Sequence, residues 1–177
     1  MKICFAGPFS LARLGGVLRS GVPDYDEFPP VSDYLLQLIE RGHFVEAVML
    51  SGAVTKTTRF SGDQINATLL PLRRSGRTSD FYQKEIRLLE TFYNTNQFDM
   101  IHAQWPYEYA SAGLRQRAPL LVTAHDAPLT IAKYTRPLRY WGMRAVLAFT
   151  VVPRLKHLVA ISPYLAKYYK RRHLYRR

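Results

Sequence analysis

The sequence has a single cysteine, and it lacks internal repeats, low-complexity tracts and long apolar runs. Cys4 therefore has no partner for an intramolecular disulfide, which favours a reducing compartment and hence the cytoplasm. Within residues 133–156 the longest uncharged run is Ala145–Pro153, far short of the roughly 20 residues that span a bilayer. The N-terminal segment MKICFAGPFS is broken at Gly7-Pro8, so it is typical of a first strand and too short for a signal peptide.

Acidic residues are absent from the last 51 positions, since Asp126 is the final one in the chain. Residues 127–177 hold 12 of the 25 Lys and Arg residues, whereas residues 1–126 hold the other 13 together with all 13 Asp and Glu. The net charge of +12 therefore lies entirely in the C-terminal segment. This asymmetry predicts an anionic partner, a membrane surface or a phosphate group. A solvated basic face is the alternative, and nothing resembles a nucleic-acid-binding module.

What the chain does contain is a regular alternation of short apolar runs and amphipathic periodicity over one domain, residues 1–177. The expected strands are Lys2–Ala6, Phe44–Leu50, Ile65–Leu70, Asp99–Ala103, Leu120–Ala124 and His157–Ile161. The expected helices are Val31–Gly42, Thr78–Asn96, Tyr107–Arg117, Pro137–Val152 and one opened by Pro163. Strands that alternate with helices in this way predict an α/β fold with a mostly parallel sheet.

Two of the expected helices carry candidate N-terminal caps. Ser32 is expected to cap Val31–Gly42, and Ser79 or Asp80 to cap Thr78–Asn96. A side-chain oxygen at the cap accepts a hydrogen bond from one of the first free amides of the helix.

The position of a binding site follows from the predicted sheet. In parallel sheets ligands bind outside the carboxyl ends of the strands. The residues that directly follow strands here are Gly7-Pro8, Ser51-Gly52, Gln104-Trp105, His125-Asp126 and Ser162-Pro163.

Four segments resemble, in the same order, the N-terminal domain of GT-B glycosyltransferases of family 4. They are PVSDYLLQLIERGHFVEAVML (30–50), FDMIHAQWPYEYASAGL (98–114), LLVTAHDAP (120–128) and HLVAISPYLAKYYKRR (157–172). The resemblance covers nearly the whole chain and implies a Rossmann-like, doubly wound sheet with helices on both faces, one half of a GT-B fold.

The resemblance also implies an enzyme of the hexosyltransferase type. Such an enzyme transfers a sugar from a nucleotide-diphosphate donor to a carbohydrate or lipid-linked acceptor in a cleft between two halves. This chain corresponds to the acceptor-side half, the nucleotide-sugar half is absent from it, and on this interpretation it is inactive alone. The nucleotide-sugar is a co-substrate, no further cofactor is expected, and no cluster has the spacing of metal ligands.

His125 and Asp126 are the candidate catalytic residues. An imidazole can donate or accept a hydrogen bond, and the resemblance implies that His125 contacts the donor sugar near the reacting centre. Asp126 would orient His125 or cap the following loop. The alternative is a structural histidine at a strand end.

Gly15 and Gly16 are the candidate residues for the donor phosphates, because glycine amides can approach phosphate oxygens closely. In the family the glycine-rich loop leads quickly into the first helix, whereas VLRSGVPDYDEFPP intervenes here. Gly21, or the turn at Pro29-Pro30, is an alternative location, and so is a plain surface loop for the glycines.

Trp105, Glu108 and Ser162 are the candidate sugar-binding residues. Trp105 and Glu108 follow a strand, where an aromatic face and a carboxylate can receive a sugar, although Glu108 also suits the first turn of a helix. Tyr107 is expected to pack, and His102 to lie in the core. Ser162 is expected to cap the Pro163 helix, with a ligand contact as its secondary role.

Residues Lys133–Lys156 are the candidate contact with an anionic membrane surface. Through them the protein would associate peripherally with the inner face of the membrane. Leu138, Trp141, Ala145, Ala148, Phe149 and Val152 have helical spacing and are flanked by Arg136, Arg139, Arg144 and Arg154. Such a stripe suits an interfacial helix, or simply a core-facing one.

Two other functions remain open at this point. One is a non-catalytic basic α/β module that binds anionic membranes or phosphate ligands, and the other is half of another nucleotide-sugar enzyme, such as an epimerase.

Overall fold

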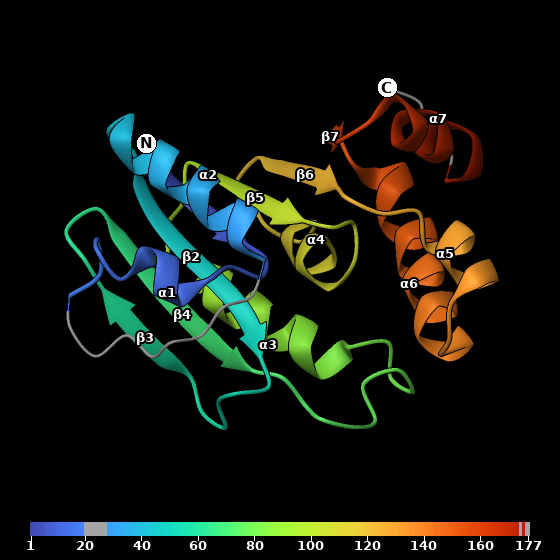
Figure 1. Cartoon of the computed structure of the whole chain (residues 1–177), viewed down its shortest axis with the longest axis horizontal. Helices are drawn as coiled ribbons and strands as arrows, with labels where there is room; N and C mark the ends of the chain where they lie inside the picture. The colour runs from blue at the N-terminus through green and yellow to red at the C-terminus, as the bar shows by residue number, and fades with distance from the viewer. Residues whose placement is uncertain (20–27, 174, 176–177) are drawn as a thin grey trace.

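The structure is a computed structural model that describes residues 1–19, 28–173 and 175. Seven strands form one sheet in the order β3-β4-β2-β1-β5-β6-β7 (Figure 1). They are β1 Lys2–Ala6, β2 Phe44–Ser51, β3 Thr58–Ser61, β4 Ile65–Pro71, β5 Met100–Gln104, β6 Leu120–Ala124 and β7 His157–Ala160. Every pair is parallel except β3 and β4, which are antiparallel.

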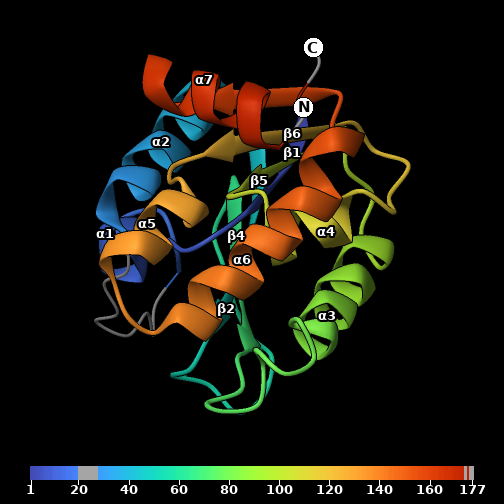
Figure 2. The same cartoon turned by 90° about the vertical axis from the view of Figure 1, so that its right-hand side faces the viewer.

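Helices cover both faces of this sheet (Figure 2). They are α1 Leu11–Leu14, α2 Pro29–Glu40, α3 Gln83–Asn94, α4 Glu108–Gly113, α5 Pro128–Tyr134, α6 Leu138–Val151 and α7 Pro163–Arg172, and a 3-10 turn, Val152–Arg154, follows α6. The helices α1 and α2 bury one face, whereas α3, α4, α6 and α7 bury the other. The predicted α/β, Rossmann-like, doubly wound architecture is confirmed.

The central strand β1 is apolar at every position after Lys2, because both of its faces are covered. Ile3 and Phe5 point into the core with α1 and α2, whereas Cys4 and Ala6 point into the core of the opposite face. A strand that is covered on both faces cannot alternate with polar residues, and Cys4, Phe5 and Ala6 are completely buried.

All six expected strands and all five expected helices are present; Lys2–Ala6 and Leu120–Ala124 have the predicted bounds, and the other elements have shifted ends. Three helices and strands were missed: the four-residue helix α1, the strand β3 and the helix α5. The edge strand β3 has only half-buried and exposed side chains, so it lacks an apolar signal. The helix α5 has seven residues, begins with Pro128 and has no side-chain cap.

The predicted caps of α2 and α3 were wrong. Ser32 lies inside α2, where its hydroxyl accepts a hydrogen bond from the Ser10 amide at 2.8 Å. Asp80 lies before α3 and accepts instead from Arg73 at 2.8 Å. The cap positions are held by Phe28 and Tyr82, both in the left-handed conformation and without a side-chain cap. Ser32 and Asp80 therefore make tertiary hydrogen bonds in place of the expected caps of their own helices.

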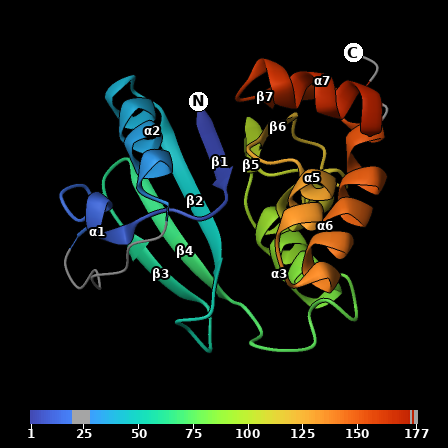
Figure 3. The ribbon, with the colours of Figure 1, turned by 45° about the vertical axis from the view of Figure 1, so that its right-hand side comes forward.

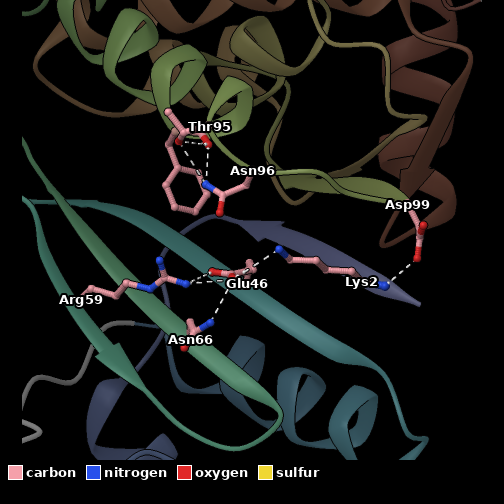
Figure 4. A network of polar contacts seen from close by, with 8 residues as sticks. Lys2, Glu46, Arg59, Asn66, Thr95, Asn96 and Asp99 are labelled. Atoms are coloured by element: carbon pink, nitrogen blue, oxygen red, sulfur yellow. Dashed lines mark hydrogen bonds and ion pairs between the residues drawn. The ribbon is translucent and has the colours of Figure 1, made fainter.

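A buried carboxylate links four neighbouring strands (Figure 4). Glu46 on β2 is 2% exposed. Its oxygens accept hydrogen bonds from Arg59 on β3 at 3.0 and 3.2 Å and from Asn66 on β4 at 2.9 Å. Lys2 on β1 lies 3.7 Å away. These partners offset the cost of removing the charge from water.

The order in which strands are added to the sheet reverses between β1 and β5. After β1 the chain adds β2 and β4 on one side, and it then returns to add β5 on the other side of β1. Gly7 follows β1 and Gln104 ends β5, and a Cβ atom at position 7 would lie only 2.6 Å from the Gln104 Cβ. Position 7 must therefore be glycine for the carboxyl ends of β1 and β5 to lie this close together. Ligands of open α/β sheets bind at such a reversal.

Candidate functional site

A pocket of about 400 Å³ lies at the carboxyl edge of the sheet. Residues that end or follow β1, β2, β4, β5 and β6 contribute to it, as do α4 and α6. The lining residues are Pro8, Leu50, Leu72, Arg77, Tyr82, Trp105, Glu108, Tyr109, Asp126, Tyr140, Trp141 and Arg144. The structure therefore brings together three of the predicted site residues, Trp105, Glu108 and Asp126.

His125 follows β6 and is oriented by Gln104, which the sequence reasoning did not single out as a site residue. The His125 Nε2 lies 2.6 Å from Gln104 Oε1, and an amide oxygen can only accept, so Nε2 carries the proton. Burial lowers the pKa of His125. The imidazole is therefore neutral at neutral pH, with Nδ1 as its acceptor.

Gln104 is itself fixed by the core histidine that the sequence predicted. Its Nε2 lies 3.2 Å from Nε2 of His102, which lies 2.8 Å from the Thr123 hydroxyl on β6. His102 is buried, as expected, and burial, together with the nearby His125, lowers its pKa to about 4.

Aromatic rings surround His125. The Trp105 ring centroid lies 4.6 Å from that of His125, and Phe28 lies 5.1 Å from Trp105 and 5.6 Å from His125. Trp105 has a φ of 64°, a left-handed conformation that costs free energy in a non-glycine residue and that clusters at functional sites. Its amide donates to the Thr123 carbonyl at 2.8 Å, which fixes the turn.

Asp126 is bound to tyrosines rather than to His125. The Tyr107 hydroxyl donates to its Oδ1, and the Tyr169 hydroxyl donates to its backbone oxygen at 2.9 Å. Burial raises the pKa of Asp126, although the hydrogen bond from Tyr107 and the charge of Arg144 act against this. Tyr107 is completely buried, so its predicted packing role is confirmed.

Glu108 and Arg144 form a buried pair at the floor of the pocket. Glu108 is the first residue of α4, and its Oε1 lies 3.6 Å from a guanidinium nitrogen of Arg144 on α6. The Arg144 guanidinium also lies over the rings of Tyr107, at 4.4 Å, and Tyr140, at 4.8 Å. Within the described residues, Glu108 Oε2 and Arg144 Nε have no hydrogen-bond partner.

Arg144 was expected to flank the apolar stripe and to face either a membrane surface or water, but its side chain is only 14% exposed and lies against Glu108. Arg144 lies on the same helical face as Leu147, Ala148 and Val151, which are all buried. A charge at helical spacing from core residues points inward, so this spacing could have identified Arg144 as a site residue.

A second cluster of charges holds the loop between β4 and α3 against the pocket. Arg73 donates two hydrogen bonds to the buried Glu85, at 2.8 and 2.6 Å, and one to Asp80. The Arg77 guanidinium donates to the Arg73 carbonyl at 3.1 Å and lies 5.7 Å from the Tyr82 ring. Arg77 and Tyr82 are therefore positioned as pocket walls.

The remaining predicted residues lie outside this pocket. Gly15 ends α1, its amide donating to Ala12 at 3.2 Å, and the chain then continues through Gly16 to a bridge between Leu18 and Gly62. Gly21 lies outside the described residues. Ser162 caps α7 as expected, accepting from the Leu165 amide at 3.2 Å. The phosphate role of the glycines and the ligand role of Ser162 stay predictions.

No group of three or more His, Cys, Asp or Glu side chains within the described residues could hold a metal ion. None of the helices in the described part of the chain is long and apolar enough to cross a membrane.

Sequence comparison identifies the fold that carries this pocket. The family model for Glycosyltransferase Family 4 matches residues 31–177. The chain belongs to glycosyltransferase family 4. A search of curated proteins gives no match.

A solved structure with the same fold supports the GT-B assignment. The family 4 chain is similar to sucrose-phosphate synthase from Thermosynechococcus elongatus, with a TM-score of 0.66 and 11% sequence identity. The match covers 97% of this chain and 45% of that protein. The family 4 chain thus spans less than half the length of the enzyme it matches.

In this family 4 domain the predicted membrane segment is divided between core and surface. Ala145, Ala148 and Val152 are buried, whereas Leu138 is 63% and Phe149 44% exposed. The apolar stripe is therefore largely a core-facing one, and only its outer members are available to another surface.

Proposed function

We propose that the chain forms the acceptor-side half of a hexosyltransferase that moves a sugar from a nucleotide-diphosphate donor to a carbohydrate or lipid-linked acceptor. The observation that carries this proposal is the pocket in which Trp105, Glu108 and Arg144 meet at the carboxyl edge of the sheet. An apolar wall with a few buried polar groups is the usual form of a small-molecule site.

The pocket has the groups that recognise a sugar. Trp105 offers an aromatic face for the apolar side of a pyranose ring. Glu108 Oε2 and Arg144 Nε lack partners within the described residues, which costs roughly 1–3 kcal/mol for each buried group. If these side chains turn toward the pocket, a sugar hydroxyl can donate to the carboxylate or accept from the guanidinium, so acceptor binding would recover part of this cost.

His125 lies beside the pocket, and we assign it to the transferred sugar. Its Nε2 proton is held by Gln104, so Nδ1 can accept a hydrogen bond from a hydroxyl of the donor sugar. Asp126 then acts on the site indirectly, because its carboxylate fixes Tyr107 under the pocket.

The enzymatic test uses a protein that joins this chain to a nucleotide-sugar half. Release of nucleoside diphosphate is measured with a panel of nucleotide-sugars and acceptors. We expect His125→Ala to lower turnover by about 10²-fold, the typical loss when one positioned hydrogen-bonding group is removed, with His157→Ala as the control at an exposed histidine. Unchanged turnover in His125→Ala would refute the role.

The alternatives are separated by the same assay. Interconversion of nucleotide-sugars without an acceptor would identify an epimerase. Absence of turnover with every pair, together with binding to anionic vesicles, would favour the non-catalytic module at a membrane.

The predicted phosphate role of Gly15 and Gly16 has a direct test. A Cβ atom added at position 16 meets no atom within 4 Å, so Gly16→Ala should leave the fold unchanged. If the Gly16 amide approaches the donor phosphates, this variant should raise the KM for the nucleotide-sugar without changing the unfolding free energy. An unchanged KM would place the phosphates elsewhere.

A further inference from the structure

A second concave surface lies between α5 and α7, apart from the pocket described above. Its volume is about 470 Å³. Both helices lie at the same end of the molecule as β6 and β7 (Figure 3). The polar residues that line this groove are Thr130, Lys133, Tyr164, Lys167, Arg171 and Arg172.

Hydrogen bonds fix the two walls of the α5–α7 groove relative to each other. The Thr130 hydroxyl lies 2.8 Å from the Tyr164 hydroxyl, and the Leu129 amide donates to the Tyr168 hydroxyl at 3.0 Å. Tyr168 is buried and also contacts Nε2 of His173 at 3.1 Å. The groove is therefore formed before a ligand arrives, which lowers the entropic cost of binding.

The charge of this groove is uncompensated. Lys133, Lys167, Arg171 and Arg172 have no ion pair in the described part of the chain, and no acidic residue follows Asp126. Like charges four residues apart on a helix, such as Lys167 and Arg171, destabilise it. An anion between the two helices would relieve this repulsion.

We propose that the α5–α7 groove binds a phosphate group, presented by a phosphorylated soluble ligand or by an anionic lipid headgroup. Lys and Arg donate charge-assisted hydrogen bonds to phosphate oxygens. Because one of the Thr130 and Tyr164 hydroxyls donates to the other, the accepting hydroxyl keeps its proton as one neutral donor. The proposal goes beyond sugar transfer, since the groove shares no lining residue with the pocket at Trp105.

The α5–α7 groove nevertheless lies near the candidate site, because neighbouring tyrosines of α7 contact both. Tyr168 binds the Leu129 amide in the groove, and its neighbour Tyr169 binds the backbone oxygen of Asp126. A ligand anchored by its phosphate between α5 and α7 would therefore lie close to the His125-Asp126 turn.

The experiment titrates the chain with inorganic phosphate at low salt and follows the amide resonances of Thr130, Lys133 and Tyr164 by NMR. Lys167→Gln/Arg171→Gln should weaken phosphate binding by about tenfold or more, because each charged hydrogen bond contributes about tenfold to affinity. The matched control, Lys84→Gln/Arg87→Gln, removes two exposed cations from α3.

Vesicles distinguish the two sources of the phosphate. Sedimentation with phosphatidylcholine vesicles that contain phosphatidylglycerol, competed by phosphate and lost in Lys167→Gln/Arg171→Gln, would support a lipid headgroup. Phosphate-induced shifts without sedimentation would support a soluble ligand. The proposal is overturned if the groove resonances do not move, or if the α3 control weakens binding equally. Since no sugar transfer is measured, this result is independent of the proposed enzymatic function.

Discussion

Arg144 shows what one side chain contributes at the residue scale. Although burial disfavours its charged form, the nearby Glu108 raises the pKa of Arg144 above its ordinary value. The charge therefore persists beneath the pocket, held between a carboxylate and the faces of Tyr107 and Tyr140.

Removing this charge should destabilise the chain. We expect Arg144→Met to lower the unfolding free energy by about 2–4 kcal/mol, because Glu108 is left buried without its cation. In Arg144→Met/Glu108→Gln the loss should be smaller than in Arg144→Met alone. Urea denaturation measures both, with the exposed Arg139→Met as control. Equal losses in Arg144→Met and Arg139→Met would contradict the buried pair.

The residues that sequence reasoning identified are those next to strand ends. Trp105, Glu108 and Asp126 line one pocket and His125 lies beside it, because parallel strands deliver their carboxyl ends to one edge. Gln104 lies at such an end too, but its role depends on which neighbours face it. Knowing that a residue ends a strand does not tell which side chains face it.

At the scale of elements, Glu46 acts as a joint between four strands of the sheet. Its partners lie on β1, β3 and β4, and β3 has little apolar surface of its own. The edge strand therefore depends on this carboxylate more than the central strands do.

We expect Glu46→Gln to lower the unfolding free energy by about 1–3 kcal/mol, since the hydrogen bonds of Arg59 lose their charged acceptor. Hydrogen exchange should increase most in β3 and in β4 where it pairs with β3. Glu40→Gln, at an exposed position on α2, is the control for both measurements. A uniform increase in exchange across the sheet would argue against a local joint.

The elements that sequence patterns identify are those with a buried face. Every strand covered on both sides appeared as an apolar run, whereas β3 and α5 have too few buried residues to give a pattern. The caps failed for a related reason: Ser32 and Asp80 make contacts with Ser10 and Arg73, whose positions depend on the tertiary fold.

At the scale of the whole molecule, buried histidines make stability depend on pH. Burial lowers the pKa of His102 and of His173 to about 4 each, whereas histidine in an unfolded chain has a pKa of about 6.5. The unfolded chain therefore binds more protons between these values. The stability that the neutral rings contribute is complete above about pH 6.5 and is lost as the pH falls toward 4.

We expect the unfolding free energy to fall between pH 7 and pH 4.5, with His102 accounting for about 2–3 kcal/mol of the fall. His102→Gln should reduce the pH dependence, and the exposed His157→Gln should not. Urea titrations at both pH values provide the test. An identical slope in His102→Gln and the parent chain would contradict the assignment.

The basic charge of the molecule is also distributed unevenly along the chain. The acidic and basic residues balance over residues 1–126, and the excess of +12 lies in residues 127–177. This split was visible in the sequence, but the meeting of four of these cations between α5 and α7 was not, because it depends on how the two helices pack.

The contact between Gly7 and Gln104 has a consequence for how this domain can evolve. Any side chain at position 7 would displace Gln104, and His125 would then lose the acceptor that fixes its ring. The three positions lie far apart in the sequence, yet a substitution at one is tolerated only in the context of the other two. Epistasis is thus built into the junction of β1, β5 and β6, and homologous sequences should vary these residues together or not at all.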